Sequence, residues 1–363
     1  MSSSSSSTTT ATHQRLYDFA KTALIKIFTS PYATVCDLYC GTGVDIDKYD
    51  EAQIGHYIGI DVSTSGIVEA REKWDESQRK SCTSYFCEVD PCMENLESLL
   101  EDKGVPADIV CCLQHLQLCF GTEERARSFL NNVSAMLRPG GYFFGITPDS
   151  STIWAKYQKN VEASHNRAGG MKSNLVPNCI RSESYMITFE VEEEKFPLFG
   201  KKYQLKFAND VASESHCLVH FPSLIRLARE AGLEFVEIQN LTEFYDDNRA
   251  QFSGMLLNAN PVVVDPRGKL LPRSLDVLGL YTTFVFQKPD PDTIPPIMTP
   301  LSEESSQIYE EASDLEGSSW RHQMPVVDEE RNGHPEPEIV IIPDLSKGIL
   351  GPGPADLRFP EPL

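Results

Sequence analysis

DLYCGTGVD, residues 37–45, closes an apolar run of strand length and opens a segment with helical periodicity. Gly41 and Gly43 lie at the turn between the two, where the lack of a side chain lets a ligand approach the backbone closely. The dinucleotide fingerprint requires a third glycine, and Ile46 occupies that position. The segment therefore disfavours a nicotinamide cofactor, and it is compatible with another nucleoside cofactor or with a simple tight turn.

Apolar runs of strand length alternate with helix-period segments between Thr34 and Lys288. This alternation indicates a parallel sheet covered by helices on both faces, and the order of its strands predicts a doubly wound α/β fold. Arg138-Pro139-Gly140-Gly141 is predicted to stop the helix TEERARSFLNNVSAML and to form a turn. The strand runs are ATVCDLY ending near Tyr39, HYIGID ending at Asp61, SYFCEVD ending at Asp90, ADIVCCL ending near Leu113 and GYFFGIT ending at Thr147.

Shorter alternating runs follow the fifth strand, in a region from about 182 to 221. ESYMITFEVEE and KKYQLKFA are typical of antiparallel strands, which we interpret as an insertion that forms a lid or wall for the substrate. The framework then resumes with the helix FPSLIRLAREAG, the strand EFVEIQ and a last strand GLYTTFVFQK. One domain over residues 14–288 is the predicted organisation.

The two ends of the chain differ from this domain in composition. Residues 1–13 are mostly Ser and Thr, without the features of a signal peptide, and are predicted to be a disordered tail. Residues 289–363 hold 16 Asp and Glu against 4 Lys and Arg and are rich in Pro, so we expect an acidic disordered tail. No run of 18 apolar residues occurs, so no membrane partner is expected.

The net charge of −21 opposes a general affinity for nucleic acid, since phosphate binding depends on Lys and Arg. Any RNA contact must therefore be local or be helped by a basic partner. The ten cysteines form no C-x-x-C pair, which favours reduced thiols in a cytosolic or nuclear protein over zinc or disulfide schemes. No metal site is predicted.

Two acidic residues stand at the ends of successive predicted strands. Asp61 follows Gly43 by 18 residues, where a carboxylate can accept hydrogen bonds from both ribose hydroxyls of an adenosine. Asp90 could accept from an adenine amino group. Each has a purely structural alternative, because Asp is also a favoured N-cap or turn residue. Together with the glycine turn they favour a nucleoside cofactor at this edge of the sheet.

Several motifs resemble those of eukaryotic mRNA cap guanine-N7 methyltransferases, which are class I enzymes that use S-adenosyl-L-methionine. The resemblance spans roughly Gln14 to Lys288 and is nearest to the second, divergent plant form of the family. It implies a seven-stranded, Rossmann-like class I methyltransferase sheet with an antiparallel insertion. The motifs are DLYCGTG, ADIVCCLQHLQLCF, LRPGGYFFGITPDS, FPLFGKKYQLKF, LVHFPSL, LTEFYDDN and LYTTFVFQK.

By this resemblance, the enzyme transfers a methyl group to N7 of the cap guanine of mRNA, in the nucleus, with a capping or transcription protein as a possible basic partner. N7 carries a lone pair and no proton, so no catalytic side chain is expected and alignment of the reactants suffices. His115, His216 and His220 are accordingly interpreted as packed or loop residues rather than catalysts. The implied cofactor-binding residues are Lys21, Tyr39, Gly41, Asp61, Asp90, Leu113 and Gln114.

Tyr39 and Thr42 depart from the family pattern on the cofactor side. Tyr39 replaces a glycine, so its side chain must point away from the pocket or narrow it. Thr42 replaces a lysine that helps to hold the cap phosphates. Without the resemblance, Lys21 would be interpreted as a surface lysine on an amphipathic helix.

The cap side departs further. His216 stands where the family has a glutamate that pairs with guanine, although Glu214 is nearby, and Tyr17-Asp18 replaces an Asn-Asn pair. Leu113, Gln117 and Leu118 replace family residues in the loop after the fourth strand, where Gln114 could substitute for a missing glutamine. The implied cap-binding residues are Tyr17, Asp18, Phe120, His216 and Tyr281.

These departures leave two alternatives to an active cap methyltransferase. One is a catalytically weak or inactive relative that serves as an interaction protein through its acidic tail. The other is a methyltransferase that acts on a different nucleobase or on a small molecule.

Overall fold

The computed structural model describes residues 12–77, 82–100, 106–167, 176–190, 195–208, 210–252, 254–257 and 262–292. Most of both predicted tails, residues 1–11 and 293–363, therefore lies outside the described residues. The predicted boundary at residue 13 was wrong, because helix α1 (Thr12–Phe28) already includes His13. The His13 ring stacks on Phe207 with centroids 4.0 Å apart, a contact that no local pattern announces.

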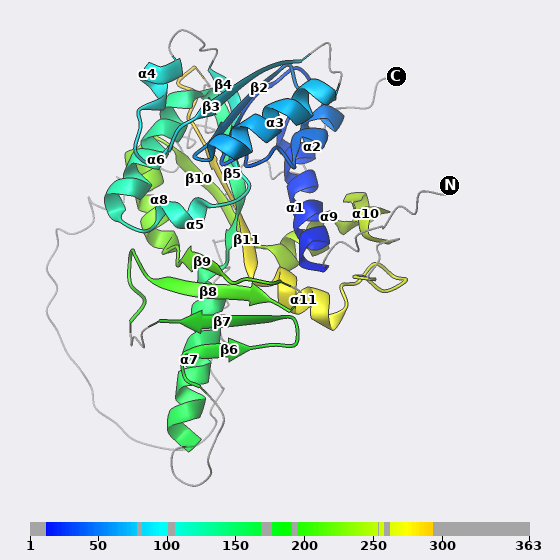
Figure 1. Ribbon diagram of the computed structural model, residues 1–363, viewed down its shortest axis with the longest axis vertical. Coiled ribbons are helices and arrows are strands. Elements are labelled where there is room, and N and C mark those ends of the chain that lie inside the picture. The colour runs from blue at the N-terminus through cyan, green and yellow to red at the C-terminus, as the bar shows by residue number, and fades with distance from the viewer. Residues whose placement is uncertain are drawn as a thin grey trace, which may run out of the picture. The chain divides into compact units, whose positions relative to one another are not determined.

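Seven strands form the central sheet, in the order β10-β11-β5-β4-β1-β2-β3 (Figure 1). β1, β2, β3, β4 and β5 are mutually parallel where they pair, whereas β11 is antiparallel to both β5 and β10. This confirms the doubly wound α/β sheet and the last strand added to it. The bounds are β1 Thr34–Leu38, β2 His56–Asp61, β3 Thr83–Glu88, β4 Ala107–Cys112, β5 Leu137–Pro148, β10 Glu234–Asn240 and β11 Tyr281–Gln287.

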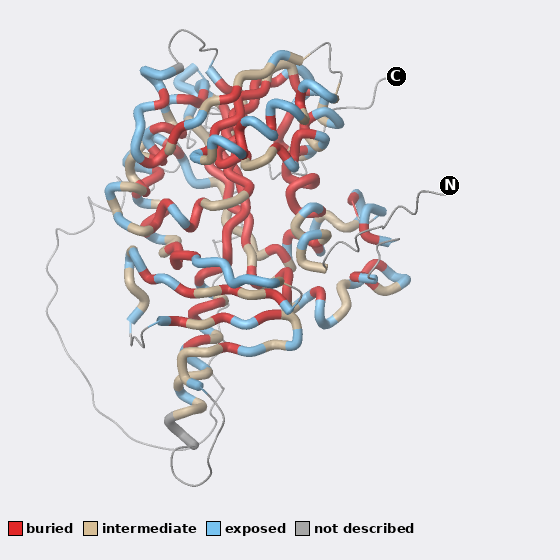
Figure 2. Tube along the Cα trace, viewed as in Figure 1, coloured by how far each residue is buried: buried red, intermediate tan, exposed pale blue. Residues whose placement is uncertain are grey.

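Helices cover both faces of the sheet, so β1 is buried along its whole length and β4 at every residue except the half-buried Asp108 (Figure 2). Val35 of β1 packs with one cluster of apolar side chains, while its neighbours Cys36 and Leu38 pack with the other. The first cluster includes α1, α2 (Ile46–Glu51), α3 (Thr64–Glu76), α9 (Leu241–Phe252), α10 (Gly254–Leu257) and α11 (Pro272–Leu278). The second includes α4 (Leu96–Leu100), α5 (Leu116–Cys119), α6 (Glu123–Met136) and α8 (Phe221–Glu230).

The segment after α6 differs from the prediction. The helix does stop at Met136, but Arg138-Pro139-Gly140-Gly141 is part of β5 rather than a free turn. Strand β5 is irregular here, since Leu137 pairs with Ala107 and the regular register resumes at Tyr142. Gly140 supplies the left-handed backbone, with φ +76°, and its N–H donates to the carbonyl of Lys288.

The insertion is a second, four-stranded sheet in the order β6-β7-β8-β9, antiparallel throughout. Its strands are β6 Cys179–Arg181, β7 Tyr185–Phe189, β8 Lys202–Phe207 and β9 Glu214–Cys217. The preceding helix α7 (Ser150–Arg167) packs Tyr157 against Phe189 of β7, with centroids 4.5 Å apart. The antiparallel insertion predicted from alternating residues is thereby confirmed.

Asp276 of α11 joins the insertion to the rest of the domain. Its carboxylate accepts hydrogen bonds from Ser182, from Tyr185 (3.0 Å) and from the Lys156 ammonium (3.1 Å). Within the part of the chain that the structure describes, no helix is both long enough and apolar enough to cross a membrane.

Candidate active site

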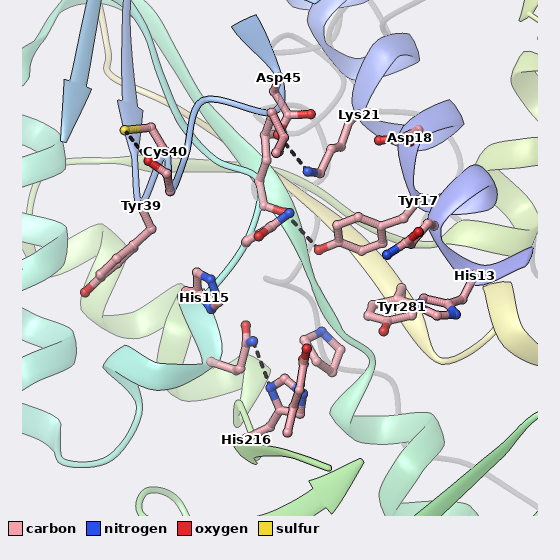
Figure 3. Close-up of a pocket in the computed structure, with 18 of the residues that line it drawn as sticks. His13, Tyr17, Asp18, Lys21, Tyr39, Cys40, Asp45, His115, His216 and Tyr281 are labelled. Carbon is pink, nitrogen blue, oxygen red and sulfur yellow. Dashed lines mark hydrogen bonds and ion pairs between the residues drawn. The ribbon is translucent and has the colours of Figure 1, made fainter. Parts of the chain in front are cut away.

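A cavity of about 520 Å³ lies where the carboxyl ends of β1, β4 and β5 meet helix α1 and the insertion (Figure 3). Its volume falls in the range of small-molecule sites, about 300–1,000 Å³. Ligands of open α/β sheets bind at this edge. Its lining comprises His13, Gln14, Tyr17, Asp18 and Lys21 of α1; Asp37 of β1, with Tyr39, Cys40, Gly41, Thr42, Val44 and Asp45 after it; Leu113, Gln114, His115 and Gln117 after β4; and Pro148, Phe207, Asp210, Glu214, His216 and Tyr281.

The two glycines of the turn after β1 have different tasks. Both have left-handed backbones, with φ +57° at Gly41 and +70° at Gly43. A Cβ at Gly43 would lie 2.5 Å from the side chain of Ile46 and 3.1 Å from Ala70, so this glycine lets helix α3 approach the turn. A Cβ at Gly41 would meet no atom within 4 Å, so this glycine faces open space beside the cavity.

Asp61 holds this turn in place. One of its carboxylate oxygens accepts from the Gly41 N–H and the other from the Ser63 N–H, both at 2.8 Å. Ser63, not Asp61, is the N-cap of α3, because its hydroxyl accepts from the Gly66 N–H. Asp61 is buried and does not line the cavity, so the predicted ribose contact remains a prediction.

Lys21 is buried inside the site rather than exposed on a surface. Its ammonium lies 2.6 Å from Asp45, and Lys48 contacts the same carboxylate at 2.8 Å and Asp18 at 3.4 Å. Burial alone would raise the pKa of Asp45, but the two lysines together lower it. Asp45 therefore stays ionised and fixes Lys21 at the top of the cavity in the view of Figure 3.

Asp37 lies deeper, at the end of β1. Burial raises its pKa to about 7, and the nearby charge of Asp45 adds to this shift. The hydroxyl of Tyr57 donates to it at 3.0 Å. The same turn thus carries one carboxylate that is readily protonated and one that is held ionised.

Tyr39 forms a wall of the cavity with its side chain directed away from Lys21 and Asp45 (Figure 3). Its backbone is left-handed, with φ +62°, which is costly for a residue other than glycine. Its hydroxyl lies 3.2 Å from the Cys92 thiol, 3.6 Å from Cys119 and 3.4 Å from Asp90. The sequence allowed the Tyr39 side chain either to point away from the pocket or to narrow it, and the structure is closer to the first of these.

Asp90 is not brought to the cavity. It lies two residues beyond the end of β3, and its carboxylate accepts from the Cys92 N–H at 2.9 Å and from Arg125 at 3.1 Å. It does not line the cavity, and the predicted contact with adenine remains a prediction. The ion pair with Arg125 involves residues 35 positions apart, which sequence reasoning missed.

The loop after β4 meets both the cofactor candidates and helix α1. Leu113 and Gln114 line the cavity as predicted, and the Leu113 carbonyl accepts from the Tyr17 hydroxyl at 2.8 Å. His115 has a left-handed backbone, with φ +74°, and burial lowers the pKa of its imidazole. Its ring meets Tyr39 edge to face, with centroids 6.0 Å apart.

Aromatic and acidic side chains gather at the other end of the cavity. The rings of Tyr17 and Tyr281 are 5.0 Å apart and nearly perpendicular, and burial raises the pKa of both hydroxyls. The imidazole of His216 is 3.0 Å from the Gln117 amide on one side and 3.4 Å from the Glu214 carboxylate on the other. Tyr17, Asp18, His216 and Tyr281 all line the cavity, and their contact with the cap remains a prediction.

The position of Phe120 differs from the predicted one at the cap site. It is completely buried among the side chains between the sheet and α6, stacks on Phe199 with centroids 5.8 Å apart and does not line the cavity. An apolar residue just after a short helix fits the core equally well, and the sequence offered no signal to separate the two. Asp45 and Asp210 line the cavity and were missed.

Lys73 of α3 was also missed. Its ammonium donates to the carbonyl of Thr42 at 2.9 Å and lies 3.4 Å from the Thr42 hydroxyl. Its ammonium thus lies beside Thr42, although Lys73 itself does not line the cavity. Lys73 also pairs with Glu69 at 2.9 Å, four residues earlier on the helix.

Comparison with known proteins agrees with this geometry. A family model described as the mRNA (guanine-N(7))-methyltransferase domain matches residues 5–289. The chain is 63% identical over 349 residues to mRNA cap guanine-N(7) methyltransferase 2 of Oryza sativa subsp. japonica, covering 96% of this chain and 98% of that protein.

The protein of the same name from Arabidopsis thaliana is 61% identical over 367 residues, with 97% of each chain covered. mRNA cap guanine-N(7) methyltransferase 1 of Arabidopsis thaliana is 33% identical over 291 residues, covering 76% of this chain and 74% of that one. The higher identity to the second plant form confirms the resemblance noted in the sequence. The chain belongs to the mRNA (guanine-N(7))-methyltransferase family.

Proposed function

We propose that this chain transfers a methyl group from S-adenosyl-L-methionine to N7 of the guanine in the 5′ cap of mRNA. The observation that carries the proposal is one cavity with two chemically different ends. The glycine turn and Lys21 form one end, and Tyr281 and His216 lie at the other (Figure 3). Gln117 and Glu214 flank His216, and Tyr17 lies between the two ends, with its ring centroid 5.3 Å from the Lys21 ammonium and 5.0 Å from Tyr281.

The residues at the first end fit the cofactor. Open space beside Gly41 admits a ligand close to the backbone, and Lys21 retains two ammonium protons for a carboxylate after its contact with Asp45. When bound, S-adenosyl-L-methionine supplies a sulfonium methyl group that needs no further activation. Leu113 and Gln114 would flank it, Tyr39 would close one wall, and each oxygen of Asp61 keeps a lone pair for a ribose hydroxyl.

The residues at the second end fit a guanine. Tyr17 and Tyr281 offer aromatic surface, and the Glu214 carboxylate can accept from the N–H groups of the Watson–Crick edge. His216 positions Glu214 and is itself positioned by Gln117. Since N7 has no proton to lose, the chain needs only to align the reactants and exclude water.

The charge of the cavity supports this chemistry. Methylation at N7 leaves the guanine ring positively charged. Lys21 is the one Lys or Arg among the described lining residues, whereas the carboxylates of Asp18, Asp210 and Glu214 face the same space. These carboxylates favour the charge that develops during transfer and cost no reorganisation at that moment.

The same charge disfavours the phosphates that follow the cap. Lys73, beside Thr42, is the cation that we assign to the cap phosphates, after release from Glu69. A basic activating or capping partner in the nucleus would supply further positive charge. The net charge of −21 supports such help.

The test is methyl transfer from labelled S-adenosyl-L-methionine to capped, unmethylated RNA, with N7-methylguanosine as the product. We expect Glu214→Gln to raise KM for capped RNA about tenfold with little effect on cofactor affinity, because it removes a charged acceptor for guanine. RNA with a 5′ triphosphate but no cap is the matched control substrate. Absence of product, with and without plant nuclear extract, would refute the proposal.

A further inference from the structure

We propose that Arg125 and Tyr39 are positioning residues that hold the Asp90 carboxylate away from the cavity and so limit the affinity for the adenine of the cofactor. We name this arrangement the Asp90 latch. The inference rests on the proposed function, because it requires a cofactor in the cavity. It goes further by identifying what restrains an adenine acceptor in this chain.

Three contacts from three different segments hold Asp90. The backbone N–H of Cys92 donates to Oδ1 at 2.9 Å, and the Tyr39 hydroxyl lies 3.4 Å from the same oxygen. From helix α6, an Nη2 of Arg125 reaches Oδ2 at 3.1 Å. Tyr39 lines the cavity and its hydroxyl contacts the Asp90 carboxylate, whereas Asp90 does not line the cavity.

The wall that closes the latch is under backbone strain. Tyr39 and His115 both have left-handed backbones, with φ +62° and +74°, and their rings meet edge to face. Side chains other than glycine, Asn or Asp adopt this conformation at a cost, and such residues gather where a structure has two arrangements.

The Asp90–Arg125 pair is suited to reversible release. Both side chains are partly exposed, at 27% and 33%, so water can replace the ion pair at little cost. A released Asp90 could accept a hydrogen bond from the exocyclic amino group of adenine, and hydrogen bonds to a charged acceptor are the stronger kind. The observed affinity is then the intrinsic affinity multiplied by the released fraction.

The experiment measures binding of S-adenosyl-L-homocysteine to the full chain by calorimetry, for the wild type and for Arg125→Met. We expect the variant to bind about threefold to tenfold more tightly, since the released fraction rises. Arg127→Met is the matched control. It removes an arginine of the same helix whose carboxylate partners, Glu123 and Glu230, lie on the outer surface, and it should leave the affinity unchanged.

Two further measurements separate the latch from a general change in structure. Tyr39→Phe keeps the ring and removes only the hydroxyl, so it should tighten binding in the same direction by a smaller factor. S-inosyl-L-homocysteine replaces the adenine amino group with a carbonyl. The preference for S-adenosyl-L-homocysteine over this analogue should increase in Arg125→Met and return to the wild-type ratio in Arg125→Met/Asp90→Asn.

Weaker or unchanged binding by Arg125→Met overturns the inference, as does a gain that survives Asp90→Asn. If the wild type binds and Arg125→Met does not differ, the latch fails and the proposed function stands. If neither protein binds, both fail. Binding by Arg125→Met alone, with dependence on Asp90, would support a latch that is almost fully closed in the wild type.

Discussion

The seven-stranded sheet and the four-stranded insertion reach the same cavity by different means. The sheet contributes the backbone of the turn at Gly41, together with residues at strand ends such as Asp37, Pro148 and Tyr281. The insertion contributes side chains, Glu214 and His216, on an exposed antiparallel framework. Backbone geometry is hard to change without loss of the fold, whereas side chains on a lid can be exchanged.

The largest effect is expected from a substitution at a crowded point of the central sheet. A Cβ at Gly145 would lie 1.9 Å from the carbonyl oxygen of Cys112 and 2.5 Å from the ring of Phe284. We expect Gly145→Ala to lower the free energy of unfolding by about 3 kcal/mol or more and to abolish both cofactor binding and methyl transfer. Urea denaturation measures this.

Gly254→Ala is the control for that measurement, because a Cβ there meets no atom within 4 Å. It should change stability by less than about 1 kcal/mol. An equally stable Gly145→Ala would show that β4, β5 and β11 are packed less closely than described.

The next largest effect concerns the cofactor end. Lys21→Met leaves Asp45 buried with Lys48 as its remaining partner, so we expect a loss of about 3 kcal/mol in stability together with loss of S-adenosyl-L-homocysteine binding. The double variant Lys21→Met/Asp45→Asn also removes the negative charge of Asp45, so it should recover stability but not binding. Lys26→Met breaks an exposed pair with Glu51 and is the surface control. Recovery of binding in the double variant would contradict a direct role for Lys21.

A smaller effect should loosen the insertion alone. Asp276→Ala removes the acceptor for Ser182, Tyr185 and Lys156, with an expected cost of about 1–2 kcal/mol. Hydrogen exchange should accelerate in β6 and β7 and stay unchanged in β1 and β4. Arg273→Ala is the control. It removes an exposed ion pair between α11 and Glu183 of the insertion and should have little effect. Uniform acceleration in both sheets would mean that they unfold as one unit.

The last two predictions are opposite pH dependences on the two sides of the glycine turn. With its pKa raised to about 7, folded Asp37 keeps a proton that the unfolded chain has released above its ordinary value of 3.8. Stability should therefore fall as pH rises from about 4 to 7, and Asp37→Asn should flatten this fall. One proton changes stability by at most about 1.4 kcal/mol per pH unit.

Asp45 should behave in the opposite way. Its lowered pKa means that its contribution is present at neutral pH and is lost as pH falls below the ordinary value of 3.8. Asp45→Asn should remove this loss of stability in acid and should reduce, but not abolish, the fall between about pH 4 and 7, because the charge of Asp45 adds to the raised pKa of Asp37. Thermal melting across the pH range distinguishes the two, and identical profiles for both variants would contradict the assignment.

The sequence predicted the fold well because the sheet is encoded by local periodicity. Strand β2 ends at Asp61, as the apolar run HYIGID indicates, and the alternation in KKYQLKFA corresponds to β8. The error at Arg138-Pro139-Gly140-Gly141 has a physical reason. Pro and Gly mark a break in regular structure, but they do not tell a turn from an irregularity within a strand, which depends on the neighbouring strand.

The site was predictable where position along the chain fixes position in space. Gly41, Leu113 and Gln114 follow strands that end at one edge, so their presence at the cavity follows from the fold. Asp90 also follows a strand, yet Arg125 holds it elsewhere, and such pairing between distant segments has no local signature. Phe120 was misplaced for a similar reason, since only the packed structure shows which side of the loop is buried.

The position of β11 has a consequence for how the chain is made. Among the residues that the structure describes it is the last strand in sequence, yet it lies between β5 and β10, so β10 cannot pair with the sheet until β11 has been made. Tyr281, at its start, also completes the wall begun by Tyr17 near the other end of the chain. A growing polypeptide on the ribosome therefore carries the glycine turn long before it carries a site. Fragments that stop short of Gln287 would hold an exposed sheet edge for chaperones to shield.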